Sequence, residues 1–155
     1  MADQHNIFIV HRHEDDALVD GLKNLLGSHG CEVRDSSVYS ATPNQAQAEG
    51  YIKEILADRI RWAGKVIVIV SPETKDHWWC DWEIGYANRY LDKRLIGVWA
   101  PGADQCDLPV PLEDYADAVV SWDAEAIIDA INGADNWQAP DGALGPERTI
   151  VRIGC

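Results

Sequence analysis

The sequence predicts an α/β fold in which helices cover both faces of a central, mainly parallel five-stranded sheet, a three-layer sandwich. Two observations support this. Short apolar runs alternate along the chain with longer amphipathic segments, and the runs are continuous instead of alternating with polar residues. Such continuous runs are typical of strands buried on both faces. The 155 residues suit one domain, which buries about two-thirds of its unfolded surface.

The first strand is expected over residues 6–11, where NIFIVH is the first continuous apolar run. Asp15 and Asp16 can cap the following helix, because aspartate oxygens accept hydrogen bonds from the amides at a helix start. Leucines at positions i, i+4, i+7 and i+8 give this helix an apolar face, and it ends near Gly30. Residues 31–34 can then form a second short strand.

A polar loop leads into a helix expected over residues 45–61, where isoleucines and a leucine recur on one face. Residues 65–70, KVIVIV, are the most continuously apolar segment of the chain. They therefore predict the central strand, which Ser71 and Pro72 end.

The second half repeats the alternation. A helix is expected over residues 81–91 and a fourth strand over residues 95–99. A loop over residues 101–115 precedes a fifth strand at residues 118–121. Asp123 can cap a final helix, whose isoleucines lie on one face.

Two regions are expected along the chain: a domain over residues 1–132 and a C-terminal tail over residues 133–155. The tail is rich in glycine, proline and aspartate, with one apolar stretch, TIVRI. It can dock on the domain as an edge strand or stay disordered.

The charge balance is strongly acidic: 13 basic and 26 acidic residues give a formal net charge of −13. An acidic surface repels phosphate backbones, so no nucleic-acid partner is expected. The apolar runs are too short to cross a bilayer, and the first residues lack the basic start of a signal peptide. We therefore expect a cytoplasmic protein without a membrane partner.

The four cysteines are scattered, without a C-x-x-C pair or zinc spacing. Free thiols are expected, with Cys31 and Cys80 as small core residues. His11 and His13 are two residues apart after the first strand, so both can point to one side. No third ligand is identifiable, and no metal is expected. A ligand-contacting loop and a solvated helix start both remain open for these histidines.

Common nucleotide-binding motifs are missing. The chain has no G-x-G-x-x-G after its first strand and no G-x-x-x-x-G-K-[ST], which argues against an ordinary dehydrogenase and a P-loop NTPase. A phosphate-receiver domain of flavodoxin-like topology would need an aspartate after the central strand and a lysine after the fifth. This chain has Ser71 and Trp122 at those places.

The segment from residue 71 to residue 91 contains three of the seven tryptophans within five positions. On a helix, Trp79 and Glu83 lie on the same side, since they are four residues apart. A carboxylate beside an aromatic ring suits a planar ligand that carries a positive charge. The alternative is a packed helix start with a solvated glutamate.

Several segments in order and spacing resemble a TIR-like domain of bacterial antiphage systems of the Thoeris type, over about four-fifths of the chain. The segments are NIFIVHRHEDD, VIVIVSPET, HWWCDWEIGYA and RLIGVWA. The resemblance implies a flavodoxin-like/TIR-like fold for residues 1–132. Two departures are Val10, where the family often has serine, and the loop over residues 35–44, which lacks the acidic and glycine-rich pattern of receptor TIR domains.

The resemblance implies NAD chemistry. Enzymatic TIR domains cleave the nicotinamide–ribose bond of NAD, and their essential glutamate and stacking aromatic align with Glu83 and Trp79. A carboxylate stabilises the cationic state of glycosidic cleavage. NAD is then the substrate, no separate cofactor is implied, and the product is a cyclic ADP-ribose-type signal read by a downstream effector. Self-association is implied as well.

NAD carries two phosphates, so an acidic protein needs local groups that offset their charge. Candidates are the backbone amides at the start of the first helix. The candidate substrate-binding side chains are Arg12, Arg34, His11, His13, Ser71 and His77.

Two other functions remain open. One is a TIR-type interaction module without catalysis, and the other is an enzyme resembling a nucleoside hydrolase or deoxyribosyltransferase, which also uses a glutamate on N-glycosidic bonds.

Overall fold

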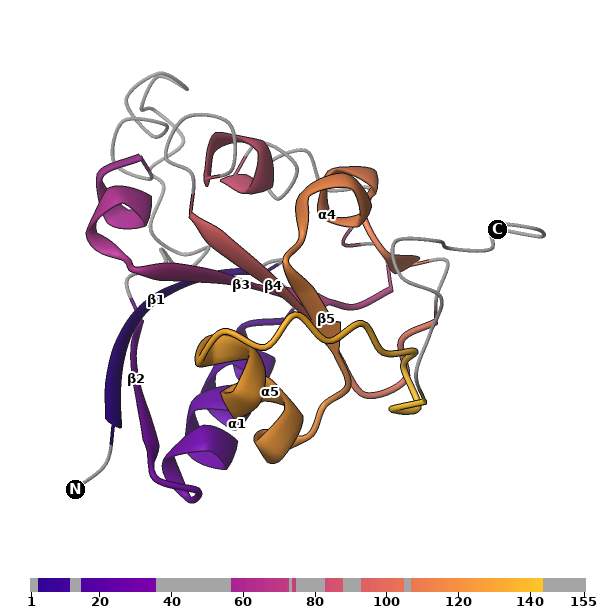
Figure 1. Cartoon of the computed structure of the whole chain (residues 1–155), viewed down its shortest axis with the longest axis horizontal. Coiled ribbons are helices and arrows are strands. Elements are labelled where there is room, and N and C mark those ends of the chain that lie inside the picture. The colour runs from indigo at the N-terminus through magenta and orange to yellow at the C-terminus, as the bar shows by residue number, and fades with distance from the viewer. Residues whose placement is uncertain are drawn as a thin grey trace.

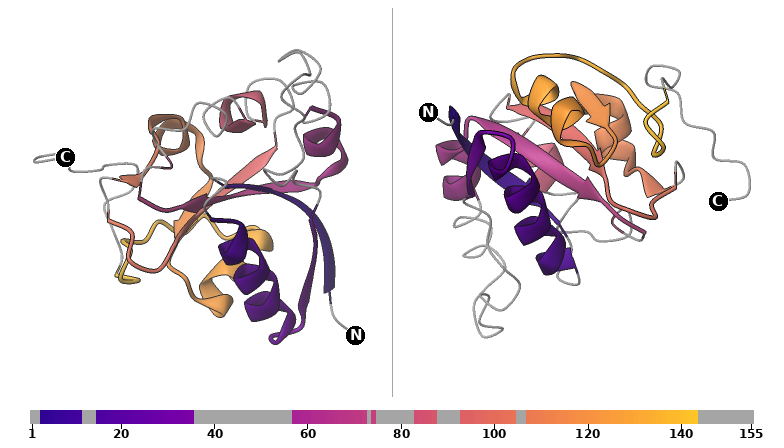
Figure 2. Two further views of the ribbon diagram at one scale, coloured as in Figure 1. Left: turned by 180° about the vertical axis from the view of Figure 1, so that it is seen from behind. Right: turned by 90° about the horizontal axis from the view of Figure 1, so that it is seen from below.

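The computed structural model describes residues 3–11, 15–35, 57–72, 74, 83–87, 93–104 and 107–143. A five-stranded sheet lies at its centre, with helices on both faces (Figures 1 and 2). The strands are β1 (Asp3–Val10), β2 (Cys31–Asp35), β3 (Lys65–Val70), β4 (Arg94–Trp99) and β5 (Ala118–Val120). Their order is β2-β1-β3-β4-β5, and every neighbouring pair is parallel. The predicted fold class is confirmed, with a sheet that is wholly parallel.

The continuous apolar strands supply two separate cores, because successive side chains of a strand point to opposite faces. One face of the sheet packs against α1 (Asp16–Gly27) and α5 (Ala124–Ile131), which lie side by side in Figures 1 and 2. The other face packs against helical residues 57–62 and 83–87 and against α4 (Val110–Tyr115). Ile67 and Ile69 of β3 face the first layer, whereas Val66, Val68 and Val70 face the second.

The strands and helices lie close to their expected places, with small shifts at the ends. β1 begins at Asp3, three residues earlier than expected, and α1 ends at Gly27, where Ser28 is its C-cap. Asp123 accepts a hydrogen bond from the Ala126 amide, as expected for an N-cap. Parts of the expected helices at residues 45–61 and 81–91 lie outside the described residues.

Helix α4 was expected to be loop. Two prolines flank its first residue, Pro109 at the N-cap and Pro111 in the first turn. Proline is tolerated there because the first amides of a helix need no helical acceptor. Leu112 is fully buried and fastens the helix to the sheet.

Residues 136–138 extend the sheet beyond β5. The Val119 amide donates to the Asn136 carbonyl at 2.9 Å, and the Gln138 amide donates to the Val119 carbonyl at 2.7 Å. Trp137 is buried, and the Trp99 indole donates to the Gln138 carbonyl at 2.9 Å. This part of the expected tail therefore docks on the sheet edge. The stretch TIVRI lies outside the described residues, and the division at residue 132 stays a prediction.

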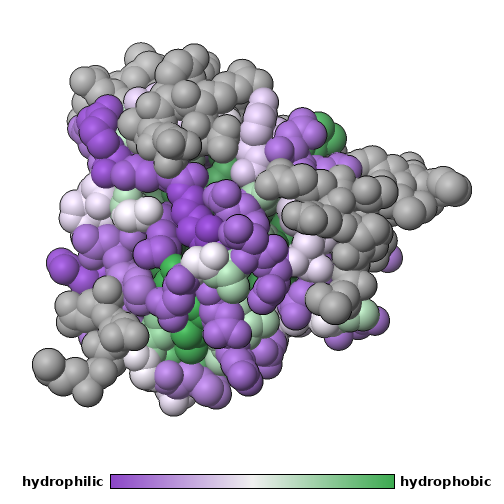
Figure 3. Space-filling model, viewed as in Figure 1, coloured by the Kyte–Doolittle hydropathy of each residue, from purple (hydrophilic) through white to green (hydrophobic). Residues whose placement is uncertain are grey.

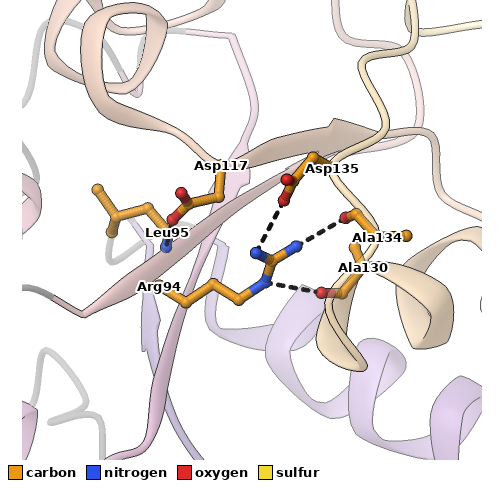
Figure 4. A network of polar contacts seen from close by, with 6 residues as sticks. All are labelled: Arg94, Leu95, Asp117, Ala130, Ala134 and Asp135. Atoms are coloured by element: carbon orange, nitrogen blue, oxygen red, sulfur yellow. Dashed lines mark hydrogen bonds and ion pairs between the residues drawn. The ribbon is translucent and has the colours of Figure 1, made fainter.

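Arg94 connects the start of β4 to the segment after α5 (Figure 4). Its guanidinium donates to the carbonyls of Ala130 and Ala134 and forms an ion pair with Asp135 at 2.9 Å. Ala130 lies in the last turn of α5, and its carbonyl also accepts from the Gly133 amide at 3.2 Å, so Arg94 adds a further donor at this helix end.

Hydrophilic residues cover most of the coloured surface in the view of Figure 3, in keeping with the high content of charged residues. Within the described ranges, the structure contains no helix with the length and apolar character needed to span a membrane. Cys31 is buried and forms no disulfide, as expected, whereas the other three cysteines lie outside the described residues.

Candidate functional site

The strand order reverses direction between β1 and β3. From β1 the chain proceeds outward to β2 on one side, and β3 leads to β4 and β5 on the other. Such a switch point opens a crevice beyond the carboxyl ends of the strands, where ligands bind in open α/β sheets. His11 directly follows β1 and Ser71 directly follows β3, so both lie at this edge.

Three buried polar side chains contact one another at this edge. Among the described residues, the buried polar or charged side chains are Asp15, Ser71, Thr74 and Glu83. Ser71 Oγ donates a hydrogen bond to Asp15 Oδ2. Ser71 Oγ also lies 2.9 Å from Thr74 Oγ1, and the Ser71 amide donates to Thr74 Oγ1 at 3.0 Å. A polar network therefore links the start of α1 to the end of β3.

Both ring nitrogens of His11 contact acceptors. Nδ1 lies 3.0 Å from the Ile9 carbonyl and Nε2 lies 2.7 Å from Asp16 Oδ1, with the side chain only 4% exposed. Both ring nitrogens of His11 therefore lie against groups of the chain itself, and its expected role as a donor to the substrate stays a prediction.

Glu83 is the first described residue of the helical segment 83–87 and is 8% exposed. Ile84 and Ala87 of the same segment are fully buried in the core on this face of the sheet. The side of the segment that carries them therefore faces the sheet. Burial raises the pKa of Glu83 from 4.5 to about 8, because desolvation penalises the charged carboxylate. The alternative of a solvated glutamate at a packed helix start is therefore wrong, because Glu83 is buried.

Arg34 does not reach this edge. It pairs in register with Asn6, five residues before His11, and so lies about 16 Å further down the strands. β2 ends beside Ile7, well short of the carboxyl end of β1. The exposed Arg34 guanidinium instead lies 5.7 Å above the ring of Trp62.

The remaining expected site residues lie outside the described residues, and their roles stay predictions. They are Arg12, His13, His77 and Trp79. No group of three metal-ligating side chains occurs within the described ranges.

Sequence reasoning missed what Asp15 and Thr74 do here. Asp15 was expected to cap α1, but its side chain makes no capping hydrogen bond. The spacing of Ser71 and Thr74 is a signal for a side-chain-stabilised turn. No local pattern could pair Asp15 with a residue 56 positions away.

Residues 8–105, more than half of the chain, match the family described as Thoeris protein ThsB, TIR-like domain. The chain belongs to this family. Membership in the ThsB family places the chain in the context of Thoeris defence systems. The matched range includes His11 and Ser71, which follow the two strands at the switch point, and Glu83. No curated protein gives a significant match to the sequence.

Solved structures share the fold. The 2-deoxyribosyltransferase of Bacillus psychrosaccharolyticus gives a TM-score of 0.53 at 14% identity, over 83% of this chain and 91% of that one. The CMP N-glycosidase BcmB of Clostridium botulinum gives 0.50 at 14% identity, over 82% and 98% of the two chains. The TIR domains of the activated Roq1 resistosome give 0.44 at 17% identity, over 65% and 62%. At identities this low, the first two matches bear on the fold alone.

Proposed function

We propose that this ThsB-family chain cleaves the nicotinamide–ribose bond of NAD and closes the remaining ADP-ribose into a cyclic signal. A separate effector of the defence system would read that signal. The observation that carries the proposal is Glu83, a buried carboxyl in the helical segment that follows β3, which is one of the two strands at the switch point. Membership in the ThsB family supports the same chemistry.

The reaction asks little of the protein beyond positioning and charge stabilisation. The bond between ribose C1′ and the nicotinamide nitrogen breaks, and its electron pair leaves with nicotinamide, which becomes neutral. No general acid is needed for this leaving group. The ribose is left as an oxocarbenium-like cation, which the Glu83 carboxylate stabilises electrostatically. The adenine ring of the same molecule then attacks the cation to give a cyclic product, whereas attack by water would give ADP-ribose and release a proton.

The first test compares NAD turnover by the wild type and by Glu83→Gln, at high protein concentration and in extract of phage-infected cells. Glutamine keeps the shape of the side chain and removes the carboxylate, so we expect nicotinamide release to fall by at least about 100-fold. Chromatography with mass spectrometry separates a cyclic product from ADP-ribose. Glu32→Gln is the matched control, because Glu32 is exposed on β2, and should turn over NAD like the wild type.

Three results would count against the proposal. Full turnover by Glu83→Gln would remove Glu83 from the reaction. Cleavage of free nucleosides without cleavage of NAD would favour an enzyme of the nucleoside hydrolase type. Defence that survives in Glu83→Gln would favour a non-catalytic interaction module.

The rate should also depend on pH in a defined direction. With a pKa of about 8, Glu83 is mostly protonated at pH 7, whereas the developing cation requires the carboxylate. We therefore expect kcat/KM for NAD to rise with pH up to about 8 and then level off. A profile that is flat between pH 6 and pH 9 would show that Glu83 is already ionised in the free protein.

A further inference from the structure

Asp15 and Ser71 lie far apart in the sequence but bind each other across the switch point. Ser71 Oγ donates to Asp15 Oδ2, and the two residues are 2% and 7% exposed. Burying a carboxylate is unfavourable unless hydrogen bonds replace its water shell. Apolar residues could fill the same space without that cost, so the pair points to a role beyond packing.

Asp15 does not perform the usual task of its position. It is the N-cap of α1, yet its side chain accepts no hydrogen bond from the helix amides. Asp123, the N-cap of α5, does accept such a bond, from the Ala126 amide at 3.0 Å. The Asp15 carboxylate is therefore directed toward the end of β3.

Thr74 fixes the other partner of this contact. The single hydroxyl hydrogen of Ser71 is donated to Asp15. The Thr74 hydroxyl lies 2.9 Å from Ser71 Oγ and donates to the Ile69 carbonyl at 3.3 Å, while its oxygen accepts from the Ser71 amide at 3.0 Å. The Thr74 amide donates in turn to the Ser71 carbonyl at 3.1 Å. Ser71 and Thr74 are thus held together where the connection from β3 to Glu83 begins.

We propose that Asp15 and Ser71 are positioning residues: their hydrogen bond clamps the start of α1 to the end of β3, and so aligns a substrate bound at this edge of the sheet with Glu83. This role rests on the proposed function. It revises the expected role of Ser71 as a direct substrate contact, because its hydroxyl hydrogen is donated to Asp15.

Steady-state kinetics with NAD test the role in the reaction. Small misplacements of a substrate chiefly lower kcat, so Ser71→Ala and Asp15→Ala should each lower kcat by about 10- to 100-fold with KM changed by less than about threefold. Asp15→Asn keeps an oxygen that accepts from Ser71 and should keep kcat within about threefold of the wild type. The double variant Asp15→Ala/Ser71→Ala should be no slower than either single variant. Asp15→Asn as slow as Asp15→Ala, or single effects that multiply in the double variant, would overturn the proposal.

Hydrogen exchange tests the clamp without reference to NAD. Ser71→Ala should speed amide exchange in the peptide that covers residues 16–20, although Ser71 is not part of α1, and Asp15→Ala should speed it in residues 71–74. Exchange that changes only around the substituted residue would overturn the clamp. A wild type that releases no nicotinamide would overturn the proposed function and the role in that reaction, while the exchange result still decides whether the clamp exists.

Discussion

Replacing Glu83 with glutamine should stabilise the fold progressively as the pH rises. In the folded wild type Glu83 keeps its proton up to a pKa of about 8, whereas in the unfolded chain it loses the proton near the ordinary value of 4.5. Between these values the folded state binds more protons, so the free energy of unfolding of the wild type falls with rising pH. This stability is fully present below pH 4.5 and has been lost once the pH exceeds about 8.

Glutamine does not titrate, so the advantage of Glu83→Gln over the wild type should grow by about 4 kcal/mol between pH 5 and pH 9. Urea unfolding of both proteins across this range measures the difference. Glu32→Gln, which removes a carboxyl from an exposed position, is measured alongside as the reference. Parallel stability curves for Glu83→Gln and the wild type would show that the buried carboxyl is ionised in the folded protein.

Trp99→Ala should lower the free energy of unfolding by about 3–5 kcal/mol, because it removes a large side chain from a packed core. Trp99 is 1% exposed and lies in β4, facing the layer that contains α4. Its indole also donates to the Gln138 carbonyl, so the docked residues 136–138 should loosen at the same time.

Trp99→Phe separates the two contributions. It keeps most of the apolar volume and loses the indole hydrogen bond, which contributes about 1 kcal/mol. Urea unfolding gives the stabilities, and amide exchange at Gln138 reports on the docked segment. Trp62→Ala is the control at an exposed tryptophan and should cost about 1 kcal/mol or less. If Trp99→Phe and Trp99→Ala lowered the free energy of unfolding equally, the contribution of Trp99 to stability would come mainly from its hydrogen bond and not from its packing.

The sheet could be predicted from the sequence because its strands are continuous apolar runs. KVIVIV begins and ends where the structure has β3, since strong apolar character on both faces leaves no competing arrangement. Helix α4 could not be predicted as readily, because Pro109 and Pro111 look like loop residues until the helix start between them is seen.

The site could be predicted only where local sequence determines it. The place of Glu83 in a helix after the central strand follows from local pattern. Its burial does not, because Glu83 lies about 100° around the helix from Ile84, just off the apolar stripe that contains Ile84 and Ala87. The distance of Arg34 from the site depends on the stagger of β2 against β1. The partner of Asp15 depends on which strands are neighbours in the sheet. Both are long-range features, which periodicity along the chain does not contain.

The docking of residues 136–138 means that the two edge strands of the sheet are protected from pairing with another chain in different ways. At the β5 border, the amide and carbonyl of Val119 already bind the chain's own backbone. At the β2 border, an incoming strand would have to desolvate the exposed side chains of Glu32 and Arg34, which carry opposite charges. Strand-to-strand polymerisation is thus disfavoured at both borders. If copies of this protein assemble, we expect them to contact one another through helices and loops, without strands of one copy pairing with the sheet of another.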